Sequence, residues 1–143
     1  MSGIVIAIDA GTTGIRSAAV DQSGQIISIA YREFTQYFPQ PGWVEHDAAE
    51  IWATTLETLT ELRSKVDQPV AAIGITNQRE TVVAWSRATG EPLHKAIVWQ
   101  DRRTAAVCQD LTDAGYLDLI RSSTGLVIDP YFSGTKFAWL FRE

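Results

Sequence analysis

The chain opens with apolar runs separated by short polar interruptions, a pattern typical of strands joined by turns. Residues 4–8 are continuously apolar and mostly β-branched, which predicts a strand that is buried on both faces. Turn signals at 9–14 and 21–24 separate this strand from two more, predicted over 15–20 and 25–34. The first third of the chain is therefore expected to form a three-stranded antiparallel meander.

An amphipathic helix is expected after an irregular, proline-containing connection over residues 37–44. Asp47 and Glu50 have the D-x-x-E spacing of a helix start, and the helix is predicted to run to about Lys65. Its apolar residues recur at helical spacing and form a stripe suited to covering one face of the sheet. These residues are Ile51, Trp52, Leu56, Leu59 and Leu62.

Three further strands are predicted, over residues 70–75, 81–85 and 96–99. A meander, a crossover helix and then more strands and helices predict an α/β fold with a mixed sheet and flanking helices. This is the plan of the ribonuclease-H-like nucleotide-binding domain shared by actin, heat-shock ATPases and sugar kinases. A likeness at this level does not determine a function.

Two short helices are predicted in the last third of the chain. Asp101 is placed to cap the first, which is expected to reach about Ala114 and to end at Gly115. Gly125 is expected to end the second.

Composition and charge narrow the class of protein. The 143 residues are 45% hydrophobic and 20% charged, which suits one compact domain or a large piece of one. A net charge of −5 argues against a nucleic-acid partner. Cys108 is the single cysteine, expected as a small buried hydrophobe in a reducing, cytoplasmic setting. No apolar run is long enough for membrane insertion.

The turn after the first strand carries the first candidate chemistry. Gly11 lets the backbone approach a ligand closely, and the successive N–H groups of a tight turn can bind an anion. Thr12 and Thr13 add hydroxyl donors. Asp9 can hold Mg²⁺ through water, and Arg16 can reach the transferred or β-phosphate as a cation. The alternative is a plain hairpin in which Asp9 accepts hydrogen bonds from the turn.

A second group of residues suits a polyol. Glu80 can accept two hydroxyl protons, Arg79 can donate several N–H groups, and Trp99 can supply an apolar wall. Tyr131 can add another hydrogen bond. Each residue also has a structural alternative: a solvated loop pair for Arg79 and Glu80, a core position for Trp99, and a turn for Tyr131.

Five segments occur in an order that resembles the glycerol kinases of the FGGY carbohydrate-kinase family. They span nearly the whole chain, and their coincidence is far more specific than any one of them. The segments are Asp9-Ala-Gly-Thr-Thr13, Pro41-Gly-Trp-Val-Glu-His-Asp47, Gly74-Ile-Thr-Asn-Gln-Arg-Glu-Thr81, Ala96-Ile-Val-Trp-Gln-Asp-Arg-Arg-Thr104 and Thr124-Gly-Leu-Val-Ile-Asp-Pro-Tyr-Phe-Ser-Gly-Thr-Lys136.

The resemblance implies ATP-dependent phosphorylation of glycerol to sn-glycerol 3-phosphate in the cytoplasm, with ATP and Mg²⁺. By the same resemblance, Thr12, Thr13 and Gly14 lie at the nucleotide phosphates. Arg16 lies near the β-phosphate of ADP, and Asp9 orients Mg²⁺.

For the substrate, the resemblance implies that Arg79, Glu80 and Tyr131 hydrogen-bond glycerol and that Trp99 packs on its carbon edge. One departure occurs in the first segment, where Ala10 stands in place of the glutamine common in glycerol kinases. Other sugar kinases of the family also vary at that position.

Residues 1–143 are expected to be part of the N-terminal, glycerol-binding domain of such a kinase, without its C-terminal domain. In this family the general base, an Asp, lies beyond the position of Glu143. The chain is therefore expected to hold no catalytic residue and to be inactive alone. The full-length protein is expected to be a homo-oligomer that binds glycerol and ATP or ADP.

Two alternatives stay open from the sequence. One is another polyol or pentulose kinase of the same family. The other is a non-enzymatic ATP-dependent switch of the actin or heat-shock type. The polyol residues argue against the switch, because a switch has no polyol to hold.

Overall fold

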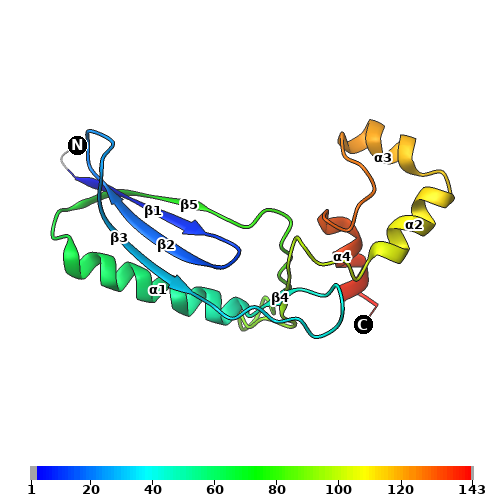
Figure 1. Cartoon of the computed structure of the whole chain (residues 1–143), viewed down its shortest axis with the longest axis horizontal. Coiled ribbons are helices and arrows are strands. Elements are labelled where there is room, and N and C mark those ends of the chain that lie inside the picture. The colour runs from blue at the N-terminus through cyan, green and yellow to red at the C-terminus, as the bar shows by residue number, and fades with distance from the viewer. Residues whose placement is uncertain (1–2, 143) are drawn as a thin grey trace. The chain divides into compact units, whose positions relative to one another are not determined.

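The computed structural model describes residues 3–142, which form two compact units (Figure 1). The first unit comprises the described residues up to Gln36 together with Asp47–Gln78. The second unit comprises Tyr37–His46 and the described residues from Arg79 onward. The predicted phosphate residues lie in the first unit, and the predicted polyol residues lie in the second.

A four-stranded mixed sheet forms one layer of the first unit (Figure 1). The strands β1 (Ile4–Ala10), β2 (Gly14–Val20) and β3 (Ile26–Glu33) make the predicted antiparallel meander. Strand β5 (Val70–Thr76) pairs with β1 in parallel, so the sheet order is β3-β2-β1-β5. The crossover between β1–β3 and β5 is helix α1 (Ala48–Lys65).

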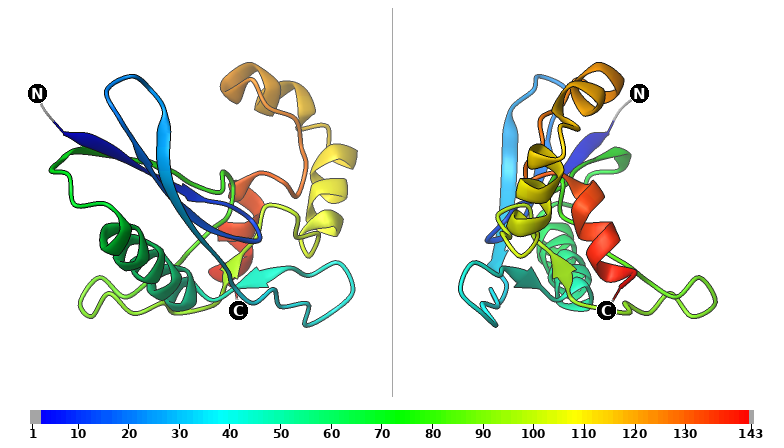
Figure 2. Two further views of the ribbon diagram at one scale, coloured as in Figure 1. Left: turned by 60° about the vertical axis from the view of Figure 1, so that its left-hand side comes forward. Right: turned by 90° about the vertical axis from the view of Figure 1, so that its right-hand side faces the viewer.

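The helix α1 covers one face of this sheet (Figure 2). Because successive side chains of a strand point to opposite faces, Ile4, Ile6 and Ile8 all turn toward the core and are at most 5% exposed. Val5 between them is 41% exposed, and Ile75 on β5 is 73% exposed. The prediction that the first strand is buried on both faces is therefore wrong, because only one of its faces is covered among the described residues.

The start and end of α1 follow from local chemistry. Asp47 is its N-cap, and Oδ1 accepts hydrogen bonds from the N–H groups of Ala49 (2.9 Å) and Glu50 (3.2 Å). The carboxylate of Glu50 also accepts the N–H and the hydroxyl of Thr35. The helix ends at Lys65, as predicted.

The apolar stripe predicted on α1 is only partly correct. Trp52 is 62% exposed and Leu56 is 44% exposed, so neither belongs to the core. Small threonines replace them at the interface, and the Thr58 hydroxyl lies 2.8 Å from the hydroxyl of Ser17 on β2. The stripe residues that do pack against the core are Ile51, Leu59 and Leu62.

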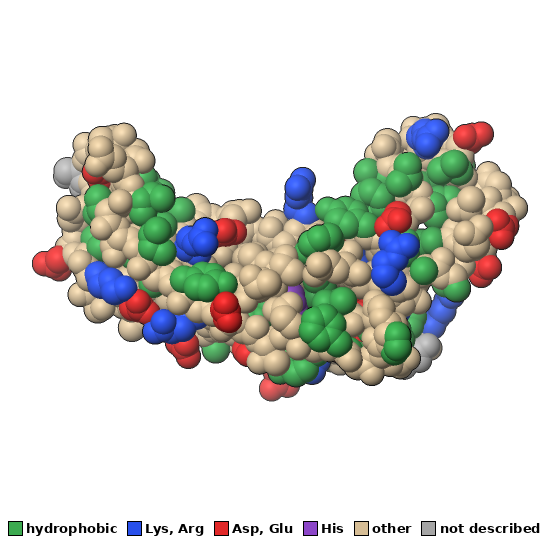
Figure 3. Space-filling model, in the orientation of Figure 1, with side chains coloured by type: hydrophobic (Ala, Val, Ile, Leu, Met, Phe, Trp, Pro, Cys, Tyr) green, Lys and Arg blue, Asp and Glu red, His purple; other side chains and the backbone are tan. Residues whose placement is uncertain are grey.

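Charged side chains of α1 pair with one another and with the edge strand β3. In Figure 3, side chains of both signs gather along the edge of the first unit that α1 occupies. The carboxylate of Glu61 forms ion pairs with the ammonium nitrogen of Lys65 at 2.6 Å and with a guanidinium nitrogen of Arg32 on β3 at 2.7 Å. The hydrogen bond from Lys65 and the charge of Arg32 hold the pKa of Glu61 below its usual value.

The second unit contains short elements. Strands β4 (Glu45–His46) and β6 (Ala96–Ile97) pair in antiparallel fashion over two residues. The strand predicted over residues 81–85 is wrong, because only isolated bridges occur there, from Val82 to Ile97 and from Trp85 to Pro92. Its partner β6 is two residues long, so no longer ladder forms along it.

Three helices complete the second unit: α2 (Ala105–Asp113), α3 (Leu117–Thr124) and α4 (Ser133–Leu140). The first two end at glycines in the left-handed conformation, as predicted from Gly115 and Gly125. Sequence analysis did not predict α4. None of the helices within residues 3–142 combines the length and the apolar character needed to cross a bilayer.

Asp101 does not cap α2; Thr104 occupies the N-cap position. Asp101 is buried, and its carboxylate accepts the N–H of Val44 at 2.7 Å and three N–H groups of Arg103. The Arg103 side chain is fully buried and also pairs with Glu45 at 2.7 Å. This buried ion-pair cluster holds the connection around Val44 to the start of α2.

Two aromatic rings enclose the same guanidinium group. The Arg103 Cζ lies 3.8 Å from the ring centroid of Trp43 and 4.6 Å from that of Trp139 on α4. The neighbouring residue Arg102 is half exposed and makes only a longer pair with Asp129, at 3.3 Å. The second unit is therefore centred on a charged side chain in addition to its apolar residues.

Candidate functional site

The turn from Gly11 to Gly14 joins β1 to β2 in the first unit. The N–H of Gly11 donates to the Gly14 carbonyl at 3.0 Å and closes the turn. A Cβ atom on Gly14 would lie 2.4 Å from the Arg32 carbonyl and 2.7 Å from the Tyr31 hydroxyl. Gly14 is therefore required by the close approach of β3, whatever its relation to a ligand.

Three consecutive carbonyl oxygens of this turn are engaged by the protein itself. Their partners are Gln78 Nε2 to the Gly11 oxygen (2.9 Å), Gln36 Nε2 to the Thr12 oxygen (3.0 Å) and the Phe34 N–H to the Thr13 oxygen (3.4 Å). Partial negative charges that would repel an anion are thus already paired within the first unit. Such an arrangement favours an approaching phosphate.

The contacts of both glutamines with this turn could not be predicted from the sequence. Gln78 lies 67 positions from Gly11, and Gln36 lies 24 positions from Thr12. The only available signal was the place of Gln78 inside the segment that resembles glycerol kinases.

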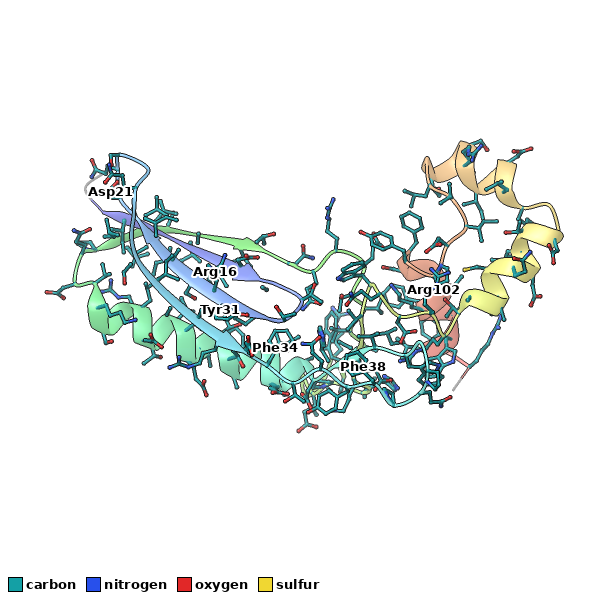
Figure 4. All side chains as sticks on the ribbon, viewed as in Figure 1. Arg16, Asp21, Tyr31, Phe34, Phe38 and Arg102 are labelled. Carbon is teal, nitrogen blue, oxygen red and sulfur yellow. The ribbon has the colours of Figure 1, made fainter. Side chains whose placement is uncertain are left out.

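Asp9 and Arg16 lie directly opposite one another in the register of β1 and β2, and both are exposed. Arg16 is also opposite Tyr31 of β3, with its Cζ 5.7 Å from the centre of that ring (Figure 4). Within residues 3–142 no group of three His, Cys, Asp or Glu residues could hold a metal ion. Asp9 is therefore a carboxylate that needs other ligands to complete a metal site.

Glu80 has an unusual conformation in the second unit. Its φ of 64° makes it the one non-glycine residue with positive φ among residues 3–142. Its Oε2 accepts both the N–H (2.8 Å) and the hydroxyl (2.7 Å) of Ser133, the first residue of α4. A carboxylate at a helix N-terminus is also stabilised by the helix dipole. The solvated-loop alternative is therefore wrong for Glu80, whereas Arg79 is exposed.

A buried lysine lies directly beside Glu80. The Lys136 side chain is 0% exposed, and its ammonium group donates to the carbonyl oxygens of Glu80 (2.7 Å) and Tyr131 (2.6 Å). Burial lowers the pKa of Lys136, and the carboxylates of Glu80, Asp101 and Asp129 oppose that shift. In the sequence, Lys136 ends the last segment that resembles glycerol kinases, and no pattern there predicts its role.

Trp99 and Tyr131 meet edge to face in the second unit, with ring centroids 5.9 Å apart and an interplanar angle of 69°. Both are partly exposed, so Trp99 is not a fully buried core residue. The N–H of Tyr131 donates to Asp129 at 2.8 Å, which confirms the predicted turn there. Lys136 thus links Tyr131, and through it Trp99, to Glu80.

Of two cavities in the second unit, neither is lined by all four of the predicted polyol residues. Glu80 and Ser133 line a cavity of about 330 Å³ whose other walls are largely apolar. Cys108 lines it too, and burial raises the pKa of its thiol, so the prediction of a buried hydrophobe is confirmed. A larger hollow of about 910 Å³, between Trp85 and Phe141, contains no predicted site residue.

Residues 4–143 match the N-terminal domain of the FGGY family of carbohydrate kinases. The chain belongs to this family. The FGGY chain is 55% identical over 139 residues to the glycerol kinase of Enterobacter sp. (strain 638). That match covers 95% of the chain and 28% of the relative, so the chain spans less than a third of the relative's length.

Two solved structures share the fold of this FGGY chain. The glycerol kinase of Plasmodium falciparum, solved with ADP, superimposes with a TM-score of 0.91 at 32% identity, over 98% of this chain and 29% of that one. The xylulose kinase of Rhodospirillum rubrum gives 0.89 at 26% identity, over 98% and 30%. The predicted family and the predicted sugar-kinase fold, a mixed sheet with flanking helices, are both confirmed.

Proposed function

We propose that the protein to which these residues belong is an ATP-dependent glycerol kinase. A terminal hydroxyl of glycerol attacks the γ-phosphorus of ATP in line, the bond to the β-phosphate oxygen breaks, and sn-glycerol 3-phosphate and ADP leave. The observation that carries the proposal is Glu80, held in the left-handed conformation by Ser133 and Lys136 within a segment 55% identical to glycerol kinases. Backbone strain of this kind concentrates at functional sites.

The polyol end of the site is assigned to four residues. Ser133 engages Oε2 of Glu80, which leaves Oε1 to accept substrate hydroxyl protons. Arg79 is exposed and can donate to neighbouring hydroxyls. The edge-to-face pair of Trp99 and Tyr131 offers an apolar surface for the carbon edge and a phenolic hydroxyl. Glycerol, with its short carbon chain and three hydroxyls, suits these groups.

The phosphate end is assigned to Thr12, Thr13, Gly14 and Arg16. The turn directs three carbonyl oxygens toward protein donors, which supports the approach of phosphate oxygens to its N–H and hydroxyl groups. Arg16 is exposed on the adjacent strand and supplies positive charge. Catalysis of this kind rests on positioning and charge stabilisation.

Asp9 is the residue proposed to orient Mg²⁺. Protein sites for Mg²⁺ commonly use one or two carboxylates together with substrate phosphates and water. An exposed single carboxylate beside the Gly11–Gly14 turn fits that donor set, whereas an all-protein cage would need more carboxylates. Bound Mg²⁺ would neutralise negative charge on the phosphates.

The general base is proposed to come from outside residues 1–143. Glu80 is assigned to hydrogen-bond the substrate hydroxyls, and Asp129 accepts the N–H of Tyr131 and pairs with Arg102. Both carboxylates therefore have binding or structural roles, and the resemblance to glycerol kinases implies a base after Glu143. The 143-residue chain alone is therefore expected to show no turnover.

The proposed setting is the cytoplasm, where ATP is available, and the proposed assembly is a homo-oligomer of the full-length protein. Both follow from the resemblance to glycerol kinases. Neither a nucleic acid nor a membrane is needed for the reaction.

The test is phosphoryl transfer by the purified full-length protein. With glycerol and Mg·ATP, we expect ADP release and sn-glycerol 3-phosphate, identified by phosphorus NMR. Glu80→Gln should raise the KM for glycerol strongly, because an acceptor oxygen is lost, whereas Glu91→Gln, on an exposed turn of the same unit, should not. Absence of glycerol phosphorylation by the wild-type protein would overturn the proposal.

A chimera tests the placement of the base. Residues 1–143 are joined to the remainder of the Enterobacter glycerol kinase, to which they are 55% identical. We expect the chimera to phosphorylate glycerol and the 143-residue chain to be inactive. Turnover by the 143-residue chain would contradict a base outside it.

A second candidate is a pentulose kinase, because a xylulose kinase shares the fold at 26% identity. The 55% identity to glycerol kinases favours glycerol. Comparing kcat/KM for glycerol and xylulose separates the two. A switch of the actin type finds no support, since the chain belongs to a family of carbohydrate kinases.

A further inference from the structure

Lys136 is a fully buried charged side chain of the second unit that the proposed reaction does not use. It is 0% exposed, and burial of an ammonium group is unfavourable unless hydrogen bonds offset the loss of hydration. An apolar residue of similar volume fills such a position at lower cost. Its two bonds therefore point to a task other than filling space.

The two bonds of Lys136 end on two residues of the proposed polyol site. Its ammonium group donates to the carbonyl of Glu80, 56 positions away, and to the carbonyl of Tyr131, in the loop before α4. An ammonium group has three donors on a single nitrogen, so it can hold two carbonyls together where an amide or hydroxyl holds them less well.

Ser133 and Lys136 act on Glu80 from one side of one helix. They are three positions apart on α4, so their side chains lie on the same face. Ser133 holds the carboxylate of Glu80, and Lys136 holds its main-chain carbonyl. These two points of attachment stabilise a conformation, φ 64°, that non-glycine residues rarely adopt.

We propose that Lys136 is a positioning residue for the polyol site, which fixes the main chain of Glu80 and of Tyr131 so that both side chains are presented together. This inference rests on the proposed function, in which Glu80 and Tyr131 bind a polyol. Lys136 itself contacts no substrate and acts through those two residues.

The kinetic test is Lys136→Met in the full-length protein. The variant keeps the length of the side chain and removes all donors, so Glu80 and Tyr131 are no longer tied together. We expect the KM for glycerol to rise on the order of 10- to 100-fold, because small misplacements of binding groups have effects of that size. The KM for ATP should stay within about twofold of the wild-type value, since the residues assigned to phosphate lie in the first unit.

Lys65→Met is the matched control. Lys65 is a half-exposed lysine at the end of α1, paired only with neighbours on the surface, so both KM values should stay unchanged. Equal KM values for glycerol in Lys136→Met and wild type would overturn the inference. So would a parallel loss for both substrates, because that is what a purely structural lysine predicts.

A crystal structure of Lys136→Met tests the positioning claim without any assay. We expect the φ of Glu80 to leave the left-handed region and its carboxylate to separate from Ser133. Retention of both features would overturn the inference even if glycerol is the substrate. Loss of both would support it even if the wild-type protein phosphorylates another polyol, so the two proposals fail separately.

Lys136→Gln provides the same two readouts if the methionine variant does not fold. Its amide keeps two N–H donors on a shorter side chain, so one of the two carbonyls should remain bound. We expect a several-fold rise in the KM for glycerol, smaller than for methionine. An unchanged KM together with an unchanged Glu80 would count against the role of Lys136.

Discussion

The two units of this chain are stabilised in different ways. The first buries Ile4, Ile6 and Ile8 of one strand against Leu62 of a long helix, and the polar side chains buried with them are uncharged hydroxyls. The second has strands of two residues and buries charged groups in addition to apolar side chains. Its buried polar residues are Glu45, His46, Asp101, Thr104 and Lys136, together with the Arg103 side chain.

The two kinds of core tolerate different substitutions. An apolar core loses stability in proportion to the volume removed, and its neighbours can relax into the space. A buried ion pair is less forgiving, because removal of one partner leaves the other charged and without compensation. Single substitutions in the second unit should therefore be the most damaging.

The largest effect is expected for Arg103→Met. It leaves the buried carboxylates of Glu45 and Asp101 without their cation, which costs about 3–5 kcal/mol in the free energy of unfolding of the second unit. Urea unfolding followed by tryptophan fluorescence measures it, since four of the five tryptophans, including Trp43 and Trp139, belong to this unit.

Arg102→Met is the control next in sequence. Arg102 is half exposed and pairs with Asp129 on the surface, so its loss should cost less than about 1 kcal/mol. Equal effects of the two arginine substitutions would show that burial of the ion pair does not distinguish the second unit.

Leu62→Ala should produce the next largest effect, in the first unit. Leu62 is 0% exposed within the apolar core, and truncation of such a leucine costs about 2–5 kcal/mol. Leu56→Ala, on the same helix but 44% exposed, should cost clearly less. Far-UV circular dichroism during urea unfolding measures both, and similar losses would contradict the observed face of α1.

Ser17 of β2 and Thr58 of α1 form a buried hydrogen bond in the first unit, with their hydroxyl oxygens 2.8 Å apart. Ser17→Ala, Thr58→Val and the double variant form a cycle, with an expected coupling of about 0.5–1.5 kcal/mol. The Thr58 hydroxyl keeps its bond to the Thr55 carbonyl in Ser17→Ala, which limits the loss. A coupling near zero would mean that the contact adds only packing.

The smallest effect is expected from Cys108. Because burial raises its thiol pKa above the usual 9.0, the neutral thiol is favoured in the folded state. Its contribution to stability is present below pH 9.0 and is lost as the pH rises through the folded-state value. In Cys108→Ala, the free energy of unfolding should fall less as the pH rises above 9.0. In the wild-type protein, native Cys108 should react more slowly with iodoacetamide than Cys108 of the unfolded chain. Rapid alkylation of the native chain would contradict its burial.

Prediction from the sequence succeeded where the decisive interactions are local. Asp47 caps α1 through N–H groups two and three residues ahead, so its role is visible in a four-residue pattern. The glycines that end α2 and α3 also act locally, through their left-handed backbone conformation. The buried face of α1 was harder to predict, because Trp52 and Leu56 fit a helical period as well as the buried threonines of the helix do. Only the presence of the sheet decides which of the two faces is buried.

The candidate site shows the same division. The turn after β1 and the residues Arg79, Glu80, Trp99 and Tyr131 were singled out from their chemical types and from the family resemblance. Gln36, Gln78 and Lys136 were not assigned roles, because each acts on a main-chain carbonyl rather than through a recognisable motif. Asp101 was given a local role as a cap, whereas its carboxylate bonds to Val44, 57 positions away.

The meander, the crossover helix, the family and the residues proposed to hold a phosphate and a polyol could all be inferred from the sequence. These depend on periodicity, on caps and turns, and on segments of a few residues. Which face of α1 is buried, why Gly14 admits no side chain and how Lys136 and Ser133 hold Glu80 become visible only in the folded chain. Those features depend on distances between segments far apart in the chain, and a linear pattern contains no such distances.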